Sequence, residues 1–167
     1  MHSSVTSSRA LFASAGLLAA IVFSATAVAC DDDDDILTPK DPTWVATLSG
    51  ANEVPAKAVT GTGQATIVKS GDTYTYTVTY SGMTGPLTGG HIHGPAAAGA
   101  NAVVIVPFNT TGAGASGTLT GTFTGTNNVS ITPADLDLMM TAGNAYVNLH
   151  TSANTGGEIR GQLSKQP

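Results

Sequence analysis

The stretch Thr73-Tyr74-Thr75-Tyr76-Thr77-Val78-Thr79-Tyr80 alternates threonine with tyrosine or valine over its whole length. Successive side chains of a β-strand point to opposite faces, so the tyrosines and the valine share one face and the threonines share the other. This pattern predicts a strand with one face on a core and one face in water. The turn residues Ser70-Gly71-Asp72 and the strand-like run Gly63–Val68 precede it, which predicts a β-hairpin.

Further short segments have the composition of strands and are separated by Gly-rich, Pro-rich or Asn-rich turns. Ala102–Phe108 is a continuous apolar run, which predicts a central strand. The others are Trp44–Leu48, Leu87–His93, Ser116–Phe123, Ala145–His150 and Gly157–Leu163. About eight short strands of this kind predict an all-β fold, an antiparallel Greek-key β-sandwich of immunoglobulin-like shape.

One segment, Thr132–Met140, has the signals of a short helix. The side-chain oxygen of Thr132 can accept a hydrogen bond from a free backbone N–H of the first helical turn. Pro133 suits the first helical position, and Asp135 lies in the first turn. Gly143 follows as a stop signal. We therefore expect a single short helix that covers one end of the sandwich.

The charge of the chain excludes one class of function. The formal net charge is −5, and five of the eleven acidic residues are the run Asp31–Asp35. Between Trp44 and Lys165 there are four Lys or Arg residues against five Asp or Glu residues, without a basic patch. Nucleic-acid binding is therefore not expected. The single cysteine, Cys30, also excludes an intrachain disulfide.

The N-terminal residues predict export. Residues 1–29 contain a nearly uninterrupted apolar run and are interpreted as a lipoprotein signal peptide, because Ala27-Val28-Ala29-Cys30 resembles a bacterial lipobox. Lipidation of Cys30 would anchor the chain on the periplasmic or cell-surface side of a membrane. An ordinary signal cut after Ala29, giving a secreted protein, and a retained membrane-spanning helix are alternatives. Residues 30–43 would be an acidic flexible tether, and residues 44–165 one domain.

The histidines form the candidate site. His91 and His93 lie two residues apart in Gly89–Pro95, so in a strand they share a face, and His150 lies on the polar face of its own strand. Three neutral imidazoles could bind copper or zinc and leave a fourth position open. Neighbouring polar side chains could orient the rings or line the same surface: Tyr146, Asn148, Glu158 and Arg160. The alternative is a polar network without metal.

Four motifs in order resemble the CHRD domain, named for its occurrence in chordin. They are Leu48–Pro55 (LSGANEVP), Gly90–Ala96 (GHIHGPA), Tyr146–Thr151 (YVNLHT) and Gly157–Leu163 (GEIRGQL). The resemblance covers Trp44 to Leu163 and implies a β-rich extracytoplasmic module. It implies no particular enzymatic activity.

The His-x-His pair on a predicted Greek-key strand is also similar to copper/zinc superoxide dismutase, so the expected sandwich is superoxide dismutase-like as well. The chain has no further histidines for a second metal and no disulfide, so dismutase activity is not expected. The sequence predicts a lipid-anchored binding or structural module that is not an enzyme. A copper- or zinc-binding protein that uses His91, His93 and His150 is the alternative, and the expected partners are a metal ion or an extracytoplasmic protein.

Overall fold

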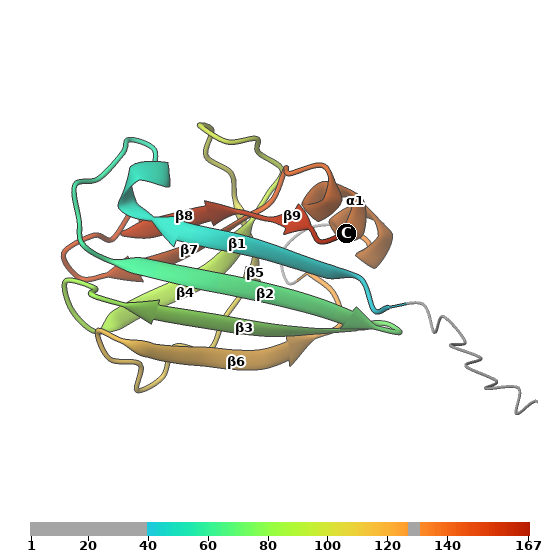
Figure 1. Ribbon diagram of the computed structural model, residues 1–167, viewed down its shortest axis with the longest axis horizontal. Helices are drawn as coiled ribbons and strands as arrows, with labels where there is room; N and C mark the ends of the chain where they lie inside the picture. The colour runs from blue at the N-terminus through green and yellow to red at the C-terminus, as the bar shows by residue number, and fades with distance from the viewer. Residues whose placement is uncertain (1–39, 127–130) are drawn as a thin grey trace, which may run out of the picture. The chain divides into compact units, whose positions relative to one another are not determined.

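The segments with strand-like composition form one antiparallel sheet in the computed structural model of this chain (Figure 1). The structure describes residues 40–126 and 131–167; the predicted signal peptide, Cys30 and all but the last residues of the predicted tether lie outside them. The strands are β1 Thr43–Ser49, β2 Thr62–Ser70, β3 Thr73–Ser81, β4 Leu87–His93, β5 Val104–Pro107, β6 Gly117–Phe123, β7 Tyr146–Thr151, β8 Ile159–Gln162 and β9 Ser164–Lys165. The helices are the 3₁₀ turn η1 Gly50–Asn52 and α1 Pro133–Thr141.

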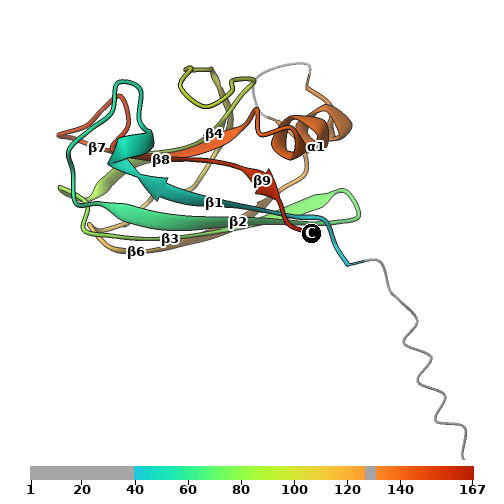
Figure 2. The ribbon, with the colours of Figure 1, turned by 45° about the horizontal axis from the view of Figure 1, so that its top comes forward.

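The sheet runs in the order β5-β4-β7-β8-β1-β2-β3-β6, with β9 also paired to β1. It curves until it is nearly closed, so that β4, β7 and β8 lie behind β1, β2 and β3 (Figures 1 and 2). The two halves are joined by the backbone pair Ser49 and Arg160 between β1 and β8, and by the pairing of β9, which follows β8, with β1. The predicted all-β antiparallel fold with one short helix is confirmed.

The core lies between the two halves and contains the predicted inward face of β3. Every second residue of this strand is buried, and the four buried positions are Tyr74, Tyr76, Val78 and Tyr80. The alternation therefore assigned the faces of this strand correctly. Residues 37–167 form one compact unit that contains the whole described core.

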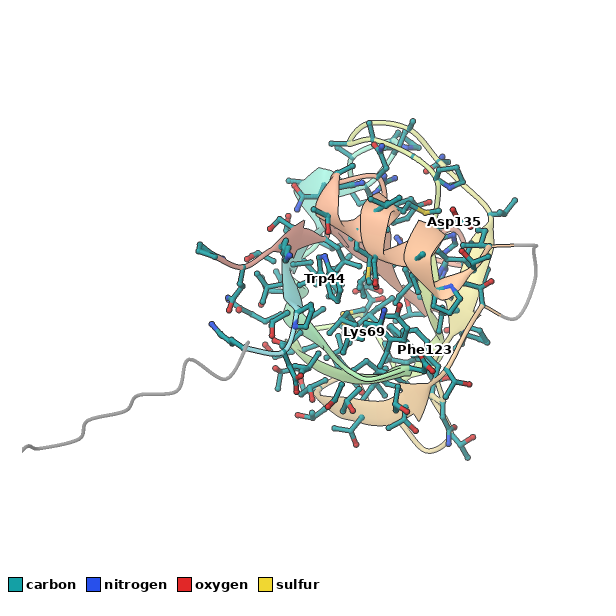
Figure 3. All side chains as sticks on the ribbon, turned by 90° about the vertical axis from the view of Figure 1, so that its right-hand side faces the viewer. Trp44, Lys69, Phe123 and Asp135 are labelled. Carbon is teal, nitrogen blue, oxygen red and sulfur yellow. The ribbon has the colours of Figure 1, made fainter. Side chains whose placement is uncertain are left out.

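Helix α1 covers one end of the curved sheet, as its sequence predicted. Thr132 and Asp135 form a reciprocal capping box, and Pro133 is at the start of the helix. Asp137 fixes the helix to the sheet, because its carboxylate accepts hydrogen bonds from Lys69 of β2 and Tyr74 of β3. Figure 3 looks at this end and shows Trp44, Lys69 and Phe123 beside the helix. Among the described residues no helix is both long and apolar enough to cross a membrane.

Strand β5 corrects one prediction. The apolar run Ala102–Phe108 was expected to be a central strand, but β5 covers only Val104–Pro107 and lies at one end of the sheet, paired with β4 alone. Pro107 has no N–H to donate, which suits an edge strand. Ile105 and Val106 are nevertheless buried, because the curvature of the sheet brings β5 over the core. Burial, rather than a central position, explains the apolar run.

Glu158 and Arg160 give the second correction. Both were expected on an outer polar face, yet their exposed fractions are 0% and 1%. Glu158 is buried among Thr84, Thr151 and Asn154, which donate hydrogen bonds to its carboxylate, whereas Arg160 is covered by η1 and by the loop before β5. Asn52 of η1 donates to the carbonyl of Arg160, and the Arg160 guanidinium donates to the carbonyl of Ala100 in the loop before β5. Strand periodicity assigns the face of a residue, but only the loops decide whether water reaches it.

Candidate metal site

Pairing of β4 with β7 brings the three histidines together. In this antiparallel pair Gly89 lies opposite His150, and His91 lies opposite Asn148. His150 is therefore the diagonal neighbour of His91 on the same face, within the reach of long and aromatic side chains. His93 follows two residues after His91 on that face. The structure thus joins all three predicted residues into one cluster across 59 residues of chain.

The three rings are close enough to share one ion. His91 Nδ1 lies 3.2 Å from His150 Nε2. One ring nitrogen from each histidine can be chosen so that all of them lie within 4.8 Å of one another. His91 and His150 are half-buried, whereas only 9% of His93 is exposed. The cluster lies on the outer face of β4 and β7 and is partly accessible from solution.

Hydrogen bonds determine which nitrogen of each ring carries a proton. His93 Nδ1 lies 3.0 Å from the carbonyl of Ala102, and His150 Nδ1 lies 3.0 Å from the carbonyl of Thr155. A carbonyl only accepts, so both Nδ1 atoms donate and both Nε2 atoms carry a lone pair. His91 Nδ1 must then donate to His150 Nε2. His93 Nε2 therefore has a lone pair that accepts no hydrogen bond, and His150 Nε2 has one that accepts only the N–H of His91.

Burial favours the neutral form of all three imidazoles. Burial, followed by the neighbouring rings of His150 and His93, lowers the pKa of His91 to about 4. Burial is also the main cause that lowers the pKa of His93 and of His150. Neutral imidazole is the form that binds a metal ion, so burial of the cluster favours the form of histidine that can act as a ligand.

The spacing and surroundings of the rings fit a transition-metal ion. His91 Nδ1 and His150 Nε2 lie 3.2 Å apart as a hydrogen-bonded pair, and two nitrogens bound to one tetrahedral ion at about 2.0 Å would keep a similar spacing, roughly 3.3 Å, once the His91 proton moved to Nε2. His93 Nε2 is buried and accepts no hydrogen bond. Gly89 leaves room for the pair, since a Cβ at this position would lie 3.0 Å from the His91 ring and 3.6 Å from that of His150.

A stack of three side chains supports His93. Its ring is parallel to Tyr146 within 2°, with centroids 4.8 Å apart, and the Arg160 guanidinium carbon lies 3.4 Å from the Tyr146 centroid. Strand β7 lies between β4 and β8, so the two partners approach Tyr146 from opposite sides. The Tyr146 hydroxyl accepts the N–H of Ala102, whose carbonyl holds His93. Tyr146 thus packs directly against His93, and Arg160 packs against the Tyr146 ring.

Asn148 lies opposite His91 on the same face of the sheet and Glu158 directly precedes β8, but neither side chain hydrogen-bonds to a ring of the cluster. The amide of Asn148 donates to the carboxylate of Glu53, while Glu158 accepts hydrogen bonds from Thr84, Thr151 and Asn154. The rings of His93 and His150 are oriented by backbone carbonyls, and the ring of His91 by that of His150. Sequence reasoning did not identify those carbonyls, because a backbone group leaves no trace in residue identity. It also did not assign Glu53 a role, although Glu53 lies in the first of the four motifs.

Comparison with known proteins identifies one domain family. The sequence profile of the CHRD domain matches residues 44–163. No curated protein and no solved structure matches the chain. CHRD domains are extracellular modules of a non-enzymatic family. Because the match covers most of the 167 residues and includes all three clustered histidines, this chain belongs to the CHRD domain family.

Proposed function

We propose that this chain is a non-catalytic extracytoplasmic binding module, held at a membrane by lipidated Cys30, whose CHRD domain binds one copper or zinc ion. His91, His93 and His150 supply the ligand nitrogens. The carbonyl of Ala102 holds the ring of His93, and the carbonyl of Thr155 holds the ring of His150. Tyr146 also packs against the His93 ring. The ion would fill the space between the three ring nitrogens.

The observation that carries the metal proposal is the buried Nε2 of His93, which accepts no hydrogen bond. A buried polar atom without a partner destabilises a fold by about 1–3 kcal/mol. In a polar network without metal, a neighbouring group would be expected to donate a hydrogen bond to His93 Nε2. Neither of the other two histidine rings does so. Its lone pair is on the same atom that metal-bound histidines commonly offer while Nδ1 donates to a carbonyl.

Membrane attachment is proposed from the sequence. The lipobox-like Ala27–Cys30 and the acidic run after it would place the domain on the periplasmic or cell-surface side of a membrane, behind a short tether. The alternatives remain a secreted protein and a retained apolar anchor. An extracytoplasmic protein could bind the same module, and metal and protein binding need not exclude each other.

Metal binding is tested on residues 37–167, which contain the described core and no histidine other than these three. Without a histidine tag, calorimetric titration with Zn(II), Cu(II) and Cu(I) should show one ion per chain. His91→Ala combined with His93→Ala should abolish binding, while Thr88→Ala, an exposed change on the same strand, should preserve it. Absence of saturable binding in the unchanged protein would reject the metal proposal.

The anchor is tested on the full chain expressed in a bacterium. Radioactive palmitate should label the protein, and Cys30→Ser should remove both the label and the membrane association. A protein that is cleaved and released into the medium or periplasm without lipid would reject the anchor and favour secretion.

A further inference from the structure

Helix α1 is apolar on two opposite faces. Its inner face buries Leu136 and Met140 in the core. On its outer face 69% of Leu138 is exposed, and Ala134 and Ala142, four residues before and after it, are exposed as well. Residues four apart in a helix lie on one face, so these three side chains form an apolar surface. A surface helix normally turns charged and polar residues outward, so the outer face of α1 has the composition of a covered face.

The charged side chains of α1 do not interrupt this outer face. Asp137 turns toward the sheet, where its carboxylate accepts hydrogen bonds from Lys69 and Tyr74. Asp135 borders the outer face at the start of the helix, where it forms the capping box with Thr132. The middle of the outer face therefore carries no charge.

A second exposed hydrophobic side chain, that of Val103, lies at the same end of the sheet. Among residues 40–126 and 131–167, Val103 and Leu138 are the large hydrophobic residues that are exposed, and 62% of Val103 is open to water. The carbonyl of Val103 accepts the N–H of Gly94, and a Cβ on Gly94 would meet the sulfur of Met139. The two exposed side chains thus lie on either side of one contact between α1 and the end of β4.

The chain enters the domain beside this helix (Figure 3). Trp44, the second residue of β1, donates from its indole N–H to the hydroxyl of Thr141, the last residue of α1. Cys30, the proposed lipid attachment, lies thirteen residues before Thr43. Even a fully extended chain of this length spans at most about 45 Å. The end of the domain that carries α1 is therefore the end that a lipid on Cys30 holds close to the membrane.

We infer that the outer face of α1, centred on Leu138, lies on the lipid surface to which Cys30 is attached. This inference rests on the proposed lipid anchor and adds an orientation to it. A surface of this size would not hold a free domain on lipid, since even one acyl chain binds only marginally. A short tether, however, gives an effective concentration in about the millimolar range. Burial of one leucine side chain then shifts the docked population about tenfold.

The test links the protein to lipid chemically, so that docking is measured whether or not a cell lipidates the chain. The chain from Cys30 onward has this residue as its one thiol, which couples to a maleimide lipid in phosphatidylcholine nanodiscs at one chain per disc. Nitroxide groups on the acyl chains broaden the methyl NMR signals of side chains that reach the hydrocarbon. Leu138, Met139 and Val103 report on the proposed surface. Leu87 reports on the opposite end of β4.

The nitroxide should broaden the signals of Leu138, Met139 and Val103 and spare that of Leu87. Leu138→Gln removes the apolar side chain and keeps a good helix former. It should lower the docked population about tenfold and restore most of the Met139 and Val103 signals. Thr88→Gln, an exposed change beside Leu87 on β4, is the matched control and should leave the broadening as it is.

Equal broadening in Leu138→Gln would mean that the link alone brings this end near the lipid, and would overturn the inference. Broadening spread evenly over the domain would also overturn it. So would effects that occur only when two chains share a disc, because the outer face of α1 would then bind a second copy. The anchor itself is decided separately by palmitate labelling of Cys30 in cells. An unlabelled chain would reject the anchor, and the inference with it, whatever the nanodiscs show.

Discussion

Replacement of Glu158 by Gln should destabilise the domain strongly. Glu158 is fully buried, and its carboxylate accepts hydrogen bonds from the backbone N–H and hydroxyl of Thr84, from the hydroxyl of Thr151 and from the amide of Asn154. These contacts hold the turn after β7, whose Thr155 carbonyl orients His150. The change therefore tests both the stability of the fold and the support of the site.

The magnitude follows from the contacts. Glutamine has the same shape but offers one oxygen and one NH₂ group, so in either orientation an NH₂ faces at least one buried donor. One unsatisfied buried donor costs about 1–3 kcal/mol, and the remaining hydrogen bonds lose the strength that the charge supplied. We expect Glu158→Gln to reduce the free energy of unfolding of residues 37–167 by about 3 kcal/mol.

The assay is urea denaturation at pH 7 and at lower pH. Burial raises the pKa of Glu158, but the hydrogen bonds from Thr151, Thr84 and Asn154 outweigh it and the net pKa lies below the ordinary value. The carboxylate therefore stabilises the fold fully above its unfolded pKa, and this contribution disappears as the pH falls through the lower folded value. The difference between Glu158→Gln and the unchanged protein should accordingly shrink below about pH 4.

Asp41→Asn is the matched control, because Asp41 is an exposed carboxylate and its change should alter stability by less than about 0.5 kcal/mol. A loss below about 1 kcal/mol in Glu158→Gln, with an unchanged urea dependence, would refute the reasoning. It would mean that the hydroxyls of Thr84 and Thr151 satisfy each other without the carboxylate. They are 3.0 Å apart, so this outcome is physically accessible.

Three further changes test other parts of the fold. Thr132→Ala should cost about 1 kcal/mol in urea denaturation, because the side chain caps α1, and Thr132→Ser should restore most of it. Tyr74→Phe should cost about 1–2 kcal/mol, since its hydroxyl lies 2.6 Å from the Asp137 carboxylate; a smaller loss would show that Lys69 alone fixes α1. Gly157→Ala should cost about 3 kcal/mol, because the added Cβ would lie 2.5 Å from Asn148 Oδ1 at a φ of 121°; unchanged thermal unfolding would contradict that packing.

The sequence by itself determined the local structure. Alternation of Thr with Tyr and Val assigned the two faces of β3, and the Thr132-Pro133 pair located the start of α1. The same period placed His91 and His93 on one face of β4. These features depend on residues a few positions apart, whose relative directions follow from strand or helix geometry alone.

Tertiary structure decided which distant segments are neighbours. The register of β4 with β7 placed His150 beside His91, and two loops buried Arg160 on a face that periodicity left open to water. Curvature of the sheet buried β5 although it lies at an edge. Strand order, loop cover and the backbone carbonyls that orient the rings arise from contacts between residues far apart in the chain, and side-chain periodicity carries no information about them.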